Sequence, residues 1–387
     1  MDIVLNLINN KIKSAEPIIN GLYMVVFAVY FTYIFVGTTM ISDRLLILPY
    51  RMCTLILTLI VAYRFITIKK SEWKEGILMG AIIAVTAGYF IVHNLKLYFI
   101  WGMMLIGAKN VSFHKIVKTA VIIGTLIMIT ALVLSQAGII EDVVKLNGRG
   151  STQHSLGINY STDCSAHVLY LMMGYCVLKN GKLKKSEYVI GITIAVLIFF
   201  ATRARNNFMC VAILISATFI YQFFRAIFEN DSSKKLIVFS TIAFVIICCA
   251  AMLYMTMAYN WDNTPMLSKI DRIISGRLNL GKTAFNNYRI SLFGNNIPQA
   301  GSGRGGSDFY FFIDSSYVLV LLERGILLFT IMCILTIKNI FKAYKNNCIY
   351  IVGIVAIIAL QCMFEHHWMD LSYNYFLLIT FASLSAQ

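Results

Sequence analysis

Charged side chains are scarce in this sequence. Only 13% of its 387 residues are Asp, Glu, Lys or Arg, whereas 59% are hydrophobic and the mean hydropathy is +0.74. Soluble proteins carry about 25% charged residues, so a chain of this length could not cover its surface in water with so few. The shortage excludes a water-soluble enzyme. It predicts an all-α polytopic membrane protein that forms a single integral membrane domain over residues 1–387.

Motifs for common cofactor chemistry are also missing. There is no Walker A loop, no framed Rossmann fingerprint and no serine-nucleophile elbow. "GSGRGG", which starts at Gly301, resembles a phosphate nest, but no strand or suitable helix start frames it, and a flexible linker is favoured. The nine cysteines contain no C-x-x-C and lie mostly in apolar runs, which is typical of buried structural thiols. We therefore expect no cofactor.

Apolar runs long enough to cross a bilayer recur along the chain. A helix needs about 20 apolar residues to cross, and we predict about 12 transmembrane helices, with a range of about 10–12 because four runs are short. The first run is too long for a signal-peptide core and lacks a small-x-small cleavage site, so we expect it to be retained. The predicted spans lie near residues 19–41, 50–68, 76–93, 95–108, 119–138, 164–178, 188–202, 207–228, 236–258, 325–341, 349–364 and 370–386.

Lysines and arginines fall on opposite sides of this arrangement. Seventeen of the 21 lysines lie in the N-terminal segment and in alternate loops, which marks these segments and both termini as cytoplasmic. Ten of the 12 arginines lie on the outer side, against the usual tendency, and need another reason. These ten are Arg44, Arg51, Arg149, Arg203, Arg205, Arg272, Arg277, Arg289, Arg304 and Arg324.

Two of the predicted outer loops are long, a first loop over residues 138–163 and a large loop over residues 258–324. In the large loop, "ISGRLNLGKTAFNN" predicts a short helix, and "DSSYVLVLLERG" predicts an interfacial helix before the tenth span. Folded against the spans, the large loop would roof a cavity and form part of an active site. The alternative is a solvated loop with ordinary surface charge.

The stretch "FFATRARNNFM" places Arg203 and Arg205 between two apolar runs. An ionisable residue at membrane depth is a candidate for function, and the guanidinium fork matches phosphate oxygens. Snorkelling from a helix end is the alternative for either residue alone, but it does not explain arginines in polar loops on the same side. We predict an anionic headgroup site with Arg149, Arg203, Arg205, Arg272, Arg277 and Arg289 as substrate-binding residues.

A metal site is not expected. "EHHWMD", from Glu365 to Asp370, has no H-x-x-x-H spacing and no further carboxylate at ligand spacing. Neither long outer loop contains the D-x-D motif that often holds a divalent cation in nucleotide-sugar enzymes. We expect arginines rather than a metal to neutralise a departing phosphate.

Four stretches, in order, resemble the bacterial O-antigen ligase and polymerase superfamily, and within it the Wzy-type polysaccharide polymerases. They are "RGSTQHSLGINYS", "ATRARNNF", "SGRLNL…YRISLFGNN" and "DSSYVLVLLERG", which together cover most of residues 149–325. The likeness places Arg205, Arg277 and Gly294 at family motif positions. The ligase branch is expected to have histidine where this chain has Asp314, eleven residues before Gly325, and this departure favours a polymerase.

The resemblance implies a metal-independent glycosyltransferase. It would polymerise undecaprenyl-pyrophosphate-linked repeat units into capsule, O-antigen or exopolysaccharide at the outer face of the bacterial inner or plasma membrane. The implied partners are these lipid-linked glycans, the lipid bilayer, and a flippase and chain-length regulator of the same pathway, with no nucleic acid. Asp314, His154 and Glu323 are unranked candidates for the base that takes a hydroxyl proton.

Two other functions remain open from the sequence. A ligase of the same superfamily would move the glycan to a different acceptor. A flippase or exporter of lipid-linked sugars would also need arginines for pyrophosphate, but along a path through the bilayer and within internal repeats. The arginines here crowd one side and no repeats are visible, so the flippase is disfavoured.

Overall fold

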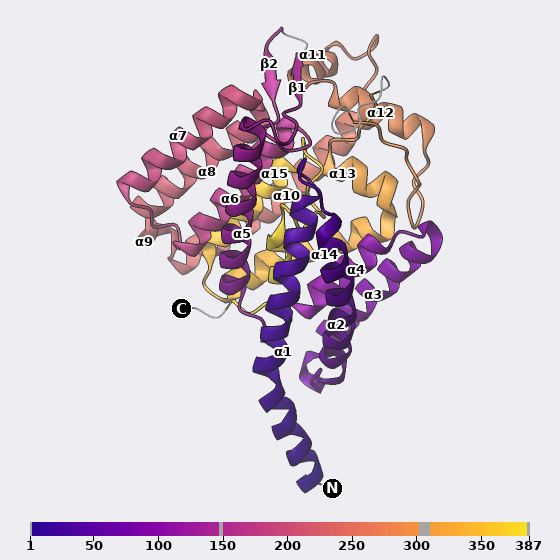
Figure 1. Cartoon of the computed structure of the whole chain (residues 1–387), viewed down its shortest axis with the longest axis vertical. Helices are drawn as coiled ribbons and strands as arrows, with labels where there is room; N and C mark the ends of the chain where they lie inside the picture. The colour runs from indigo at the N-terminus through magenta and orange to yellow at the C-terminus, as the bar shows by residue number, and fades with distance from the viewer. Residues whose placement is uncertain (1, 147–149, 302–309, 385–387) are drawn as a thin grey trace.

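The fold was analysed in a computed structural model, which describes residues 2–146, 150–301 and 310–384 (Figure 1). Over these residues the chain is helical apart from its loops and one small antiparallel sheet, in which β1 (Val144–Leu146) pairs with β2 (Thr152–His154). The helices are α1 (Asp2–Val36), α2 (Ile47–Ile66), α3 (Trp73–His93), α4 (Lys96–Gly107), α5 (Phe113–Gln136), α6 (Ser161–Leu178), α7 (Lys185–Thr202), α8 (Arg205–Phe223), α9 (Arg225–Phe228), α10 (Asp231–Ala258), α11 (Pro265–Ile273), α12 (Arg277–Asn287), α13 (Ser316–Leu319), α14 (Gly325–Lys345) and α15 (Ile349–Gln361).

Eight helical stretches in the described part of the chain are long and apolar enough to cross a membrane. Helices α4 and α15 are apolar but shorter. Large apolar side chains point outward from these helices, such as Leu55 and Leu59 on α2, as expected where lipid is the solvent. The prediction of an all-α membrane protein is confirmed. The predicted number of about twelve crossings is not confirmed, because eight stretches of the described residues are long and apolar enough to cross. The eight are Ser14–Val36, Arg44–Ile66, Lys70–His93, Phe113–Gln136, Lys185–Thr202, Arg205–Phe223, Asp231–Ala258 and Ser316–Lys345.

The connecting segments gather at two opposite ends of the bundle. We call the end that carries β1, β2, α11 and α12 the upper end, and the end toward the N-terminus the lower end (Figure 1). At the lower end, Asn110 bonds to both terminal parts of the chain, through its amide to Glu16 at 2.5 Å and through its backbone N–H to Phe381 O at 3.3 Å. The two terminal segments therefore meet at the same end of the molecule.

The last predicted span, residues 370–386, is not a long helix in its described part. Residues up to Leu384 form turns and one short 3-10 helix, Tyr375–Thr380, whose side chains are all buried. This segment packs against α4, α5 and α14, and it ends at the lower end, where Ser383 N donates to Val111 O at 2.7 Å. Its hydrophobicity serves contact with protein rather than lipid, and irregular backbone is tolerated at membrane depth when protein surrounds it.

The predicted interfacial helix in "DSSYVLVLLERG" is instead part of the core. Helix α13 is followed directly by a π-helical turn, Val320–Arg324, and then by α14, with a non-helical backbone at Gly325, where φ is 88° and ψ is 167°. Every residue of α13 is buried, because this stretch begins a long helix inside the bundle rather than lying along its surface. The other helix expected in the large loop corresponds to α12, and α11 precedes it.

Candidate functional site

A cavity of about 680 Å³ lies at the upper end of the molecule. Its walls come from the corner between α7 and α8, from α11 and α12, and from the segments before α13 and after α15. Four arginines line it, Arg203, Arg205, Arg272 and Arg277, and we call it the arginine cavity. Three carboxylates also line it: Asp271, Asp314 and Glu365.

The corner between α7 and α8 positions the first two arginines. Helix α7 ends at Thr202, and Arg203 takes a left-handed conformation with φ of 53°, which turns the chain into α8. The Arg203 guanidinium lies 5.3 Å from the Phe200 ring centroid, a cation–π contact, and its buried Nε makes no hydrogen bond. Arg205 donates from Nη2 to Ile273 O at 3.2 Å, which ties this corner to α11.

The start of α12 is held by a buried carboxylate. Asp271 accepts hydrogen bonds at Oδ1 from Leu278 N at 2.7 Å and from Asn279 N at 3.3 Å. These are free N–H groups of the first turn of α12, where a negative charge is favourable. The turn between α11 and α12 is therefore rigid, and it presents Arg272 and Arg277 to the cavity.

Arg277 contacts two carboxylates that also line the arginine cavity. It is 7% exposed; Nη2 donates to Glu365 Oε1 at 3.1 Å, and Nε lies 3.5 Å from Asp314 Oδ2. Burial raises the pKa of Glu365 to about 7, although Arg277 acts in the opposite direction. Burial also raises the pKa of Asp314, again opposed by Arg277. The three groups form a buried charged cluster in which each charge depends on the others.

Not all predicted substrate-binding residues meet here. Arg203, Arg205, Arg272 and Arg277 come together, from three separate elements. Arg289 is exposed in the segment after α12 and does not line the cavity. Arg149 lies outside the described residues, as do residues 302–306 of "GSGRGG".

The three candidate bases are in different places. Asp314 lines the arginine cavity, and it is not a helix cap, because Ser315 occupies the cap position of α13. His154 bonds through Nδ1 to Asp142 Oδ2 at 2.7 Å, while its neighbour Gln153 lines the cavity, in keeping with alternation along β2. Glu323 bonds to Arg324 and Gln299 and does not line the cavity. Of the three, Asp314 alone lines the arginine cavity.

Glu365 is a site residue that the sequence reasoning missed. In the sequence it stands out only as part of "EHHWMD", yet in the structure it is 1% exposed and pairs with Arg277. A signal was present, because an ionisable residue directly after an apolar helix is a candidate for function. Its partner could not be identified, since Arg277 is 88 positions away.

A second cavity, of about 360 Å³, is lined in part by the segment after α15, the segment that also carries Glu365. Tyr30, Tyr33, Tyr98 and Trp101 give it aromatic walls, and we call it the aromatic cavity. Its polar lining residues are Thr38, Asp43, Arg324, His366 and Asp370. Consecutive residues of the chain therefore face the two cavities, Glu365 the arginine cavity and His366 the aromatic cavity.

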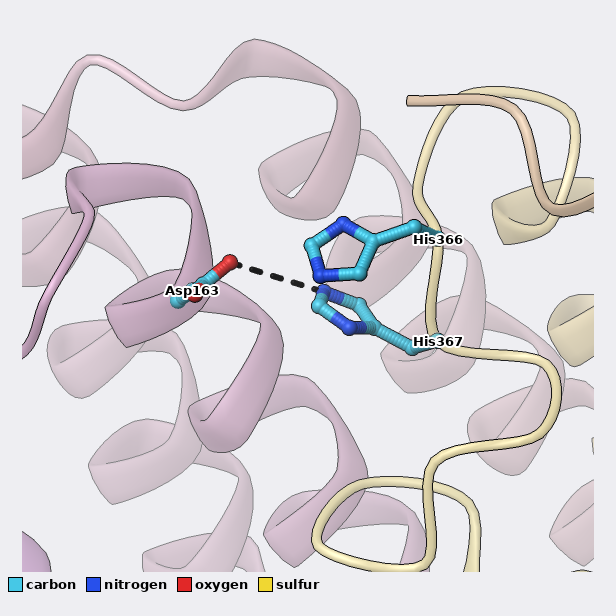
Figure 2. Close-up of side chains that lie close together, drawn as sticks. All are labelled: Asp163, His366 and His367. Atoms are coloured by element: carbon cyan, nitrogen blue, oxygen red, sulfur yellow. Dashed lines mark ion pairs between the residues drawn. The ribbon is translucent and has the colours of Figure 1, made fainter. Parts of the chain in front are cut away.

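One group of side chains has the composition of a metal site. Asp163, in the first turn of α6, lies beside His366 and His367, which follow α15 (Figure 2). None of the three lines the arginine cavity.

A comparison with protein-family models, with curated proteins and with solved structures finds no match for this chain, so its site is interpreted from its own residues.

Proposed function

We propose that this protein is a polysaccharide polymerase, a glycosyltransferase that joins repeat units carried on undecaprenyl pyrophosphate at the outer face of a bacterial cell membrane. The observation that supports this proposal is the convergence of four arginines on one cavity beside the membrane-spanning helices. A site with this much fixed positive charge suits a pyrophosphate on a lipid carrier.

The arginine cavity would hold the donor. A pyrophosphate leaving group gains negative charge as the glycosidic bond breaks, and fixed guanidiniums stabilise that charge without rearranging. Arg203 and Arg272 are held by contacts with aromatic rings, and Arg205 is held by a hydrogen bond to a backbone carbonyl. Arginine suits this task better than lysine because its planar fork makes two parallel bonds to one phosphate group.

The aromatic cavity would hold the acceptor sugar. The apolar faces of sugar rings pack against aromatic rings, and sugar hydroxyls need polar partners at the edges. The aromatic cavity combines both, with Tyr98 and Trp101 beside Arg324 and Asp370. Since Glu365 and His366 face the two cavities, donor and acceptor would meet near this segment and Asp314.

The reaction would be a single displacement. A hydroxyl oxygen of the acceptor sugar forms a bond to the anomeric carbon of the donor, and the bond from that carbon to pyrophosphate breaks. Undecaprenyl pyrophosphate leaves with the electron pair, and Asp314 accepts the hydroxyl proton. Glu365 would act by holding Arg277, through the bond from Nη2 at 3.1 Å.

The topology in this proposal has twelve crossings, with the upper end outside and both termini in the cytoplasm. Helices α1–α8, α10, α14 and α15 would supply eleven crossings, and the buried irregular segment up to Leu384 the twelfth. The meeting of both terminal segments at Asn110 supports an even number. The predominance of lysine in the lower loops supports a cytoplasmic lower end.

The proposal is tested by the length of the lipid-linked glycan in cells that lack this protein. We expect single repeat units on the outer side of the membrane and no polymer on a gel. Long lipid-linked chains without surface glycan would instead identify a ligase, and repeat units retained on the cytoplasmic side would identify a flippase. Either of these results would overturn the polymerase.

Replacing Asp314 with asparagine tests its role as the base. Asparagine keeps the size and the hydrogen-bonding oxygen but is a far weaker base, and a general base contributes about 100-fold or more to rate. We expect normal membrane abundance of Asp314→Asn and little or no polymer, measured by glycan length beside immunoblots. His154→Asn is the matched control and should make polymer of normal length, because His154 does not line the cavity. Normal polymer from Asp314→Asn would show that the proton goes elsewhere.

A further inference from the structure

The side chains of Asp163, His366 and His367 point into one shared space (Figure 2). A ligand atom of each lies within 4.8 Å of those of the other two, and His367 Nε2 is 3.8 Å from Asp163 Oδ1. They come from two elements that are far apart in sequence, the start of α6 and the segment after α15. Asp163 and His367 are buried, with exposed fractions of 5% and 0%, which is unusual for such residues, and His366 is half-buried.

Four of their polar atoms lack a hydrogen-bond partner among the described residues. Asp163 Oδ1, His366 Nδ1 and both ring nitrogens of His367 are buried and make no hydrogen bond. An unsatisfied buried polar group costs about 1–3 kcal/mol, and such groups are rare in folded proteins. Four of these atoms in one small cluster indicate that a further partner binds there.

The buried carboxylate of Asp163 also favours a bound cation. Among the described residues, no lysine or arginine forms an ion pair with this carboxylate. The other buried acidic groups of the upper end are compensated, Asp271 by backbone N–H groups and Glu365 by Arg277. A buried carboxylate without a cation is costly, and a bound cation would remove that cost.

We propose that Asp163, His366 and His367 bind one divalent transition-metal ion, with zinc as the best fit. Two imidazoles and one carboxylate form a typical zinc ligand set, and imidazole nitrogen disfavours calcium and magnesium. Zinc bonds of about 2.0–2.2 Å bring ligand atoms to roughly 3.5 Å from one another. The site therefore needs side-chain shifts of about 1 Å, which rotation about the side-chain bonds can supply.

The ion would have a structural role and would take no part in glycosyl transfer. It would fasten the segment after α15 to α6, and this segment carries Glu365, which holds Arg277. None of the three ligands lines the arginine cavity, whereas His366 also lines the aromatic cavity. A structural ion leaves neutralisation of the leaving group to the arginines. The experiment below measures zinc binding itself, so its result does not depend on the proposed function.

The experiment measures zinc in purified protein. The full chain, purified in detergent with an affinity tag that contains no histidine, is stripped with a chelator, loaded with zinc chloride and freed of excess by gel filtration. Elemental mass spectrometry should find about one zinc per chain. Zinc should also raise the unfolding temperature, and the chelator should reverse the shift, because a ligand that binds only the folded state stabilises it.

Variants assign the zinc to these residues. His367→Ala and Asp163→Asn should retain less than about one tenth of the wild-type zinc and lose the zinc-dependent shift in unfolding temperature. His154→Ala is the matched control, because it removes a half-exposed histidine of the upper end that is paired with Asp142, and it should retain all the zinc. If those two variants do not fold, the zinc content of His366→Gln is measured instead, because the glutamine amide is close in size to imidazole. This variant should also retain less zinc than the wild type. Wild-type protein without zinc after loading, or equal zinc in His366→Gln and wild type, would overturn the inference.

Discussion

Replacing Arg277 with lysine is expected to abolish polymer formation and to lower the unfolding temperature of the protein. One guanidinium reaches Glu365 through Nη2 and Asp314 through Nε, and it also donates from Nη1 to Ile274 O at 3.4 Å. A lysine ammonium is a single point and cannot make these contacts together. Breaking a buried ion pair by removing one partner costs about 3–5 kcal/mol, and lysine should lose a large part of that.

The functional loss should exceed what reduced stability explains. Loss of one preorganised donor typically slows a reaction by about 100–1,000-fold, which would leave single repeat units on the gel. Membrane abundance and thermal unfolding in detergent are measured beside glycan length. Arg289→Lys is the control, because Arg289 is exposed and does not line the cavity, and it should give polymer of normal length.

A triple variant separates stability from function. Combining Arg277→Leu with Asp314→Asn and Glu365→Gln removes the buried cation together with both anions, so no charge is left uncompensated. Its unfolding temperature should return toward that of the wild type, while polymer remains absent. Wild-type polymer from Arg277→Lys at a normal unfolding temperature would remove Arg277 from both the stability and the proposed mechanism.

The glycines at 294 and 325 are expected to tolerate no side chain, so that Gly294→Ala or Gly325→Ala prevents accumulation of folded protein. A Cβ at Gly294 would lie 2.1 Å from Glu323 O, and a Cβ at Gly325 would lie 2.3 Å from Gly294 N. Both glycines also have positive φ, of 79° and 88°. Backbone atoms cannot move aside as a flexible side chain can, so the cost should exceed about 4 kcal/mol.

The backbone contact between these glycines is part of how the large loop is fastened. Residues 291–295 bond to the start of α14 and to the π-helical turn before it, with Ile326 N donating to Ser291 O at 3.0 Å and Asn295 N donating to Leu322 O at 3.1 Å. The resemblance to the polymerase superfamily included both Gly294 and Gly325, and the structure explains why each must be glycine.

The control for this prediction is Gly138→Ala. Gly138 has a similar φ of 70°, but an added Cβ there meets nothing within 4 Å. It should cost only the left-handed backbone penalty of about 1–2 kcal/mol. Membrane abundance and unfolding temperature in detergent are compared across the three variants. Equal losses at Gly138 and Gly325 would show that φ, and not the close backbone contact, determines the effect.

Hydropathy and charge in the sequence were sufficient for the class of protein and for the four arginines that line one cavity. Apolar runs predicted a helical membrane protein, since backbone groups in lipid must be paired within each helix. The excess of arginines in the predicted outer loops singled out four residues that the structure brings together, Arg203, Arg205, Arg272 and Arg277. The charge pattern carried this information because an always-charged residue near lipid is expensive and is kept for a reason.

The tertiary structure alone decided which residues are partners. Glu365 became a site residue only through Arg277, and Asp163 became a candidate ligand only because α6 packs near the segment after α15. It also decided that the last apolar stretch is irregular and buried. The physical reason is the same in each case: an apolar side chain is equally favourable against lipid and against protein, and a buried charge is tolerable only beside a partner, whose position depends on long-range packing.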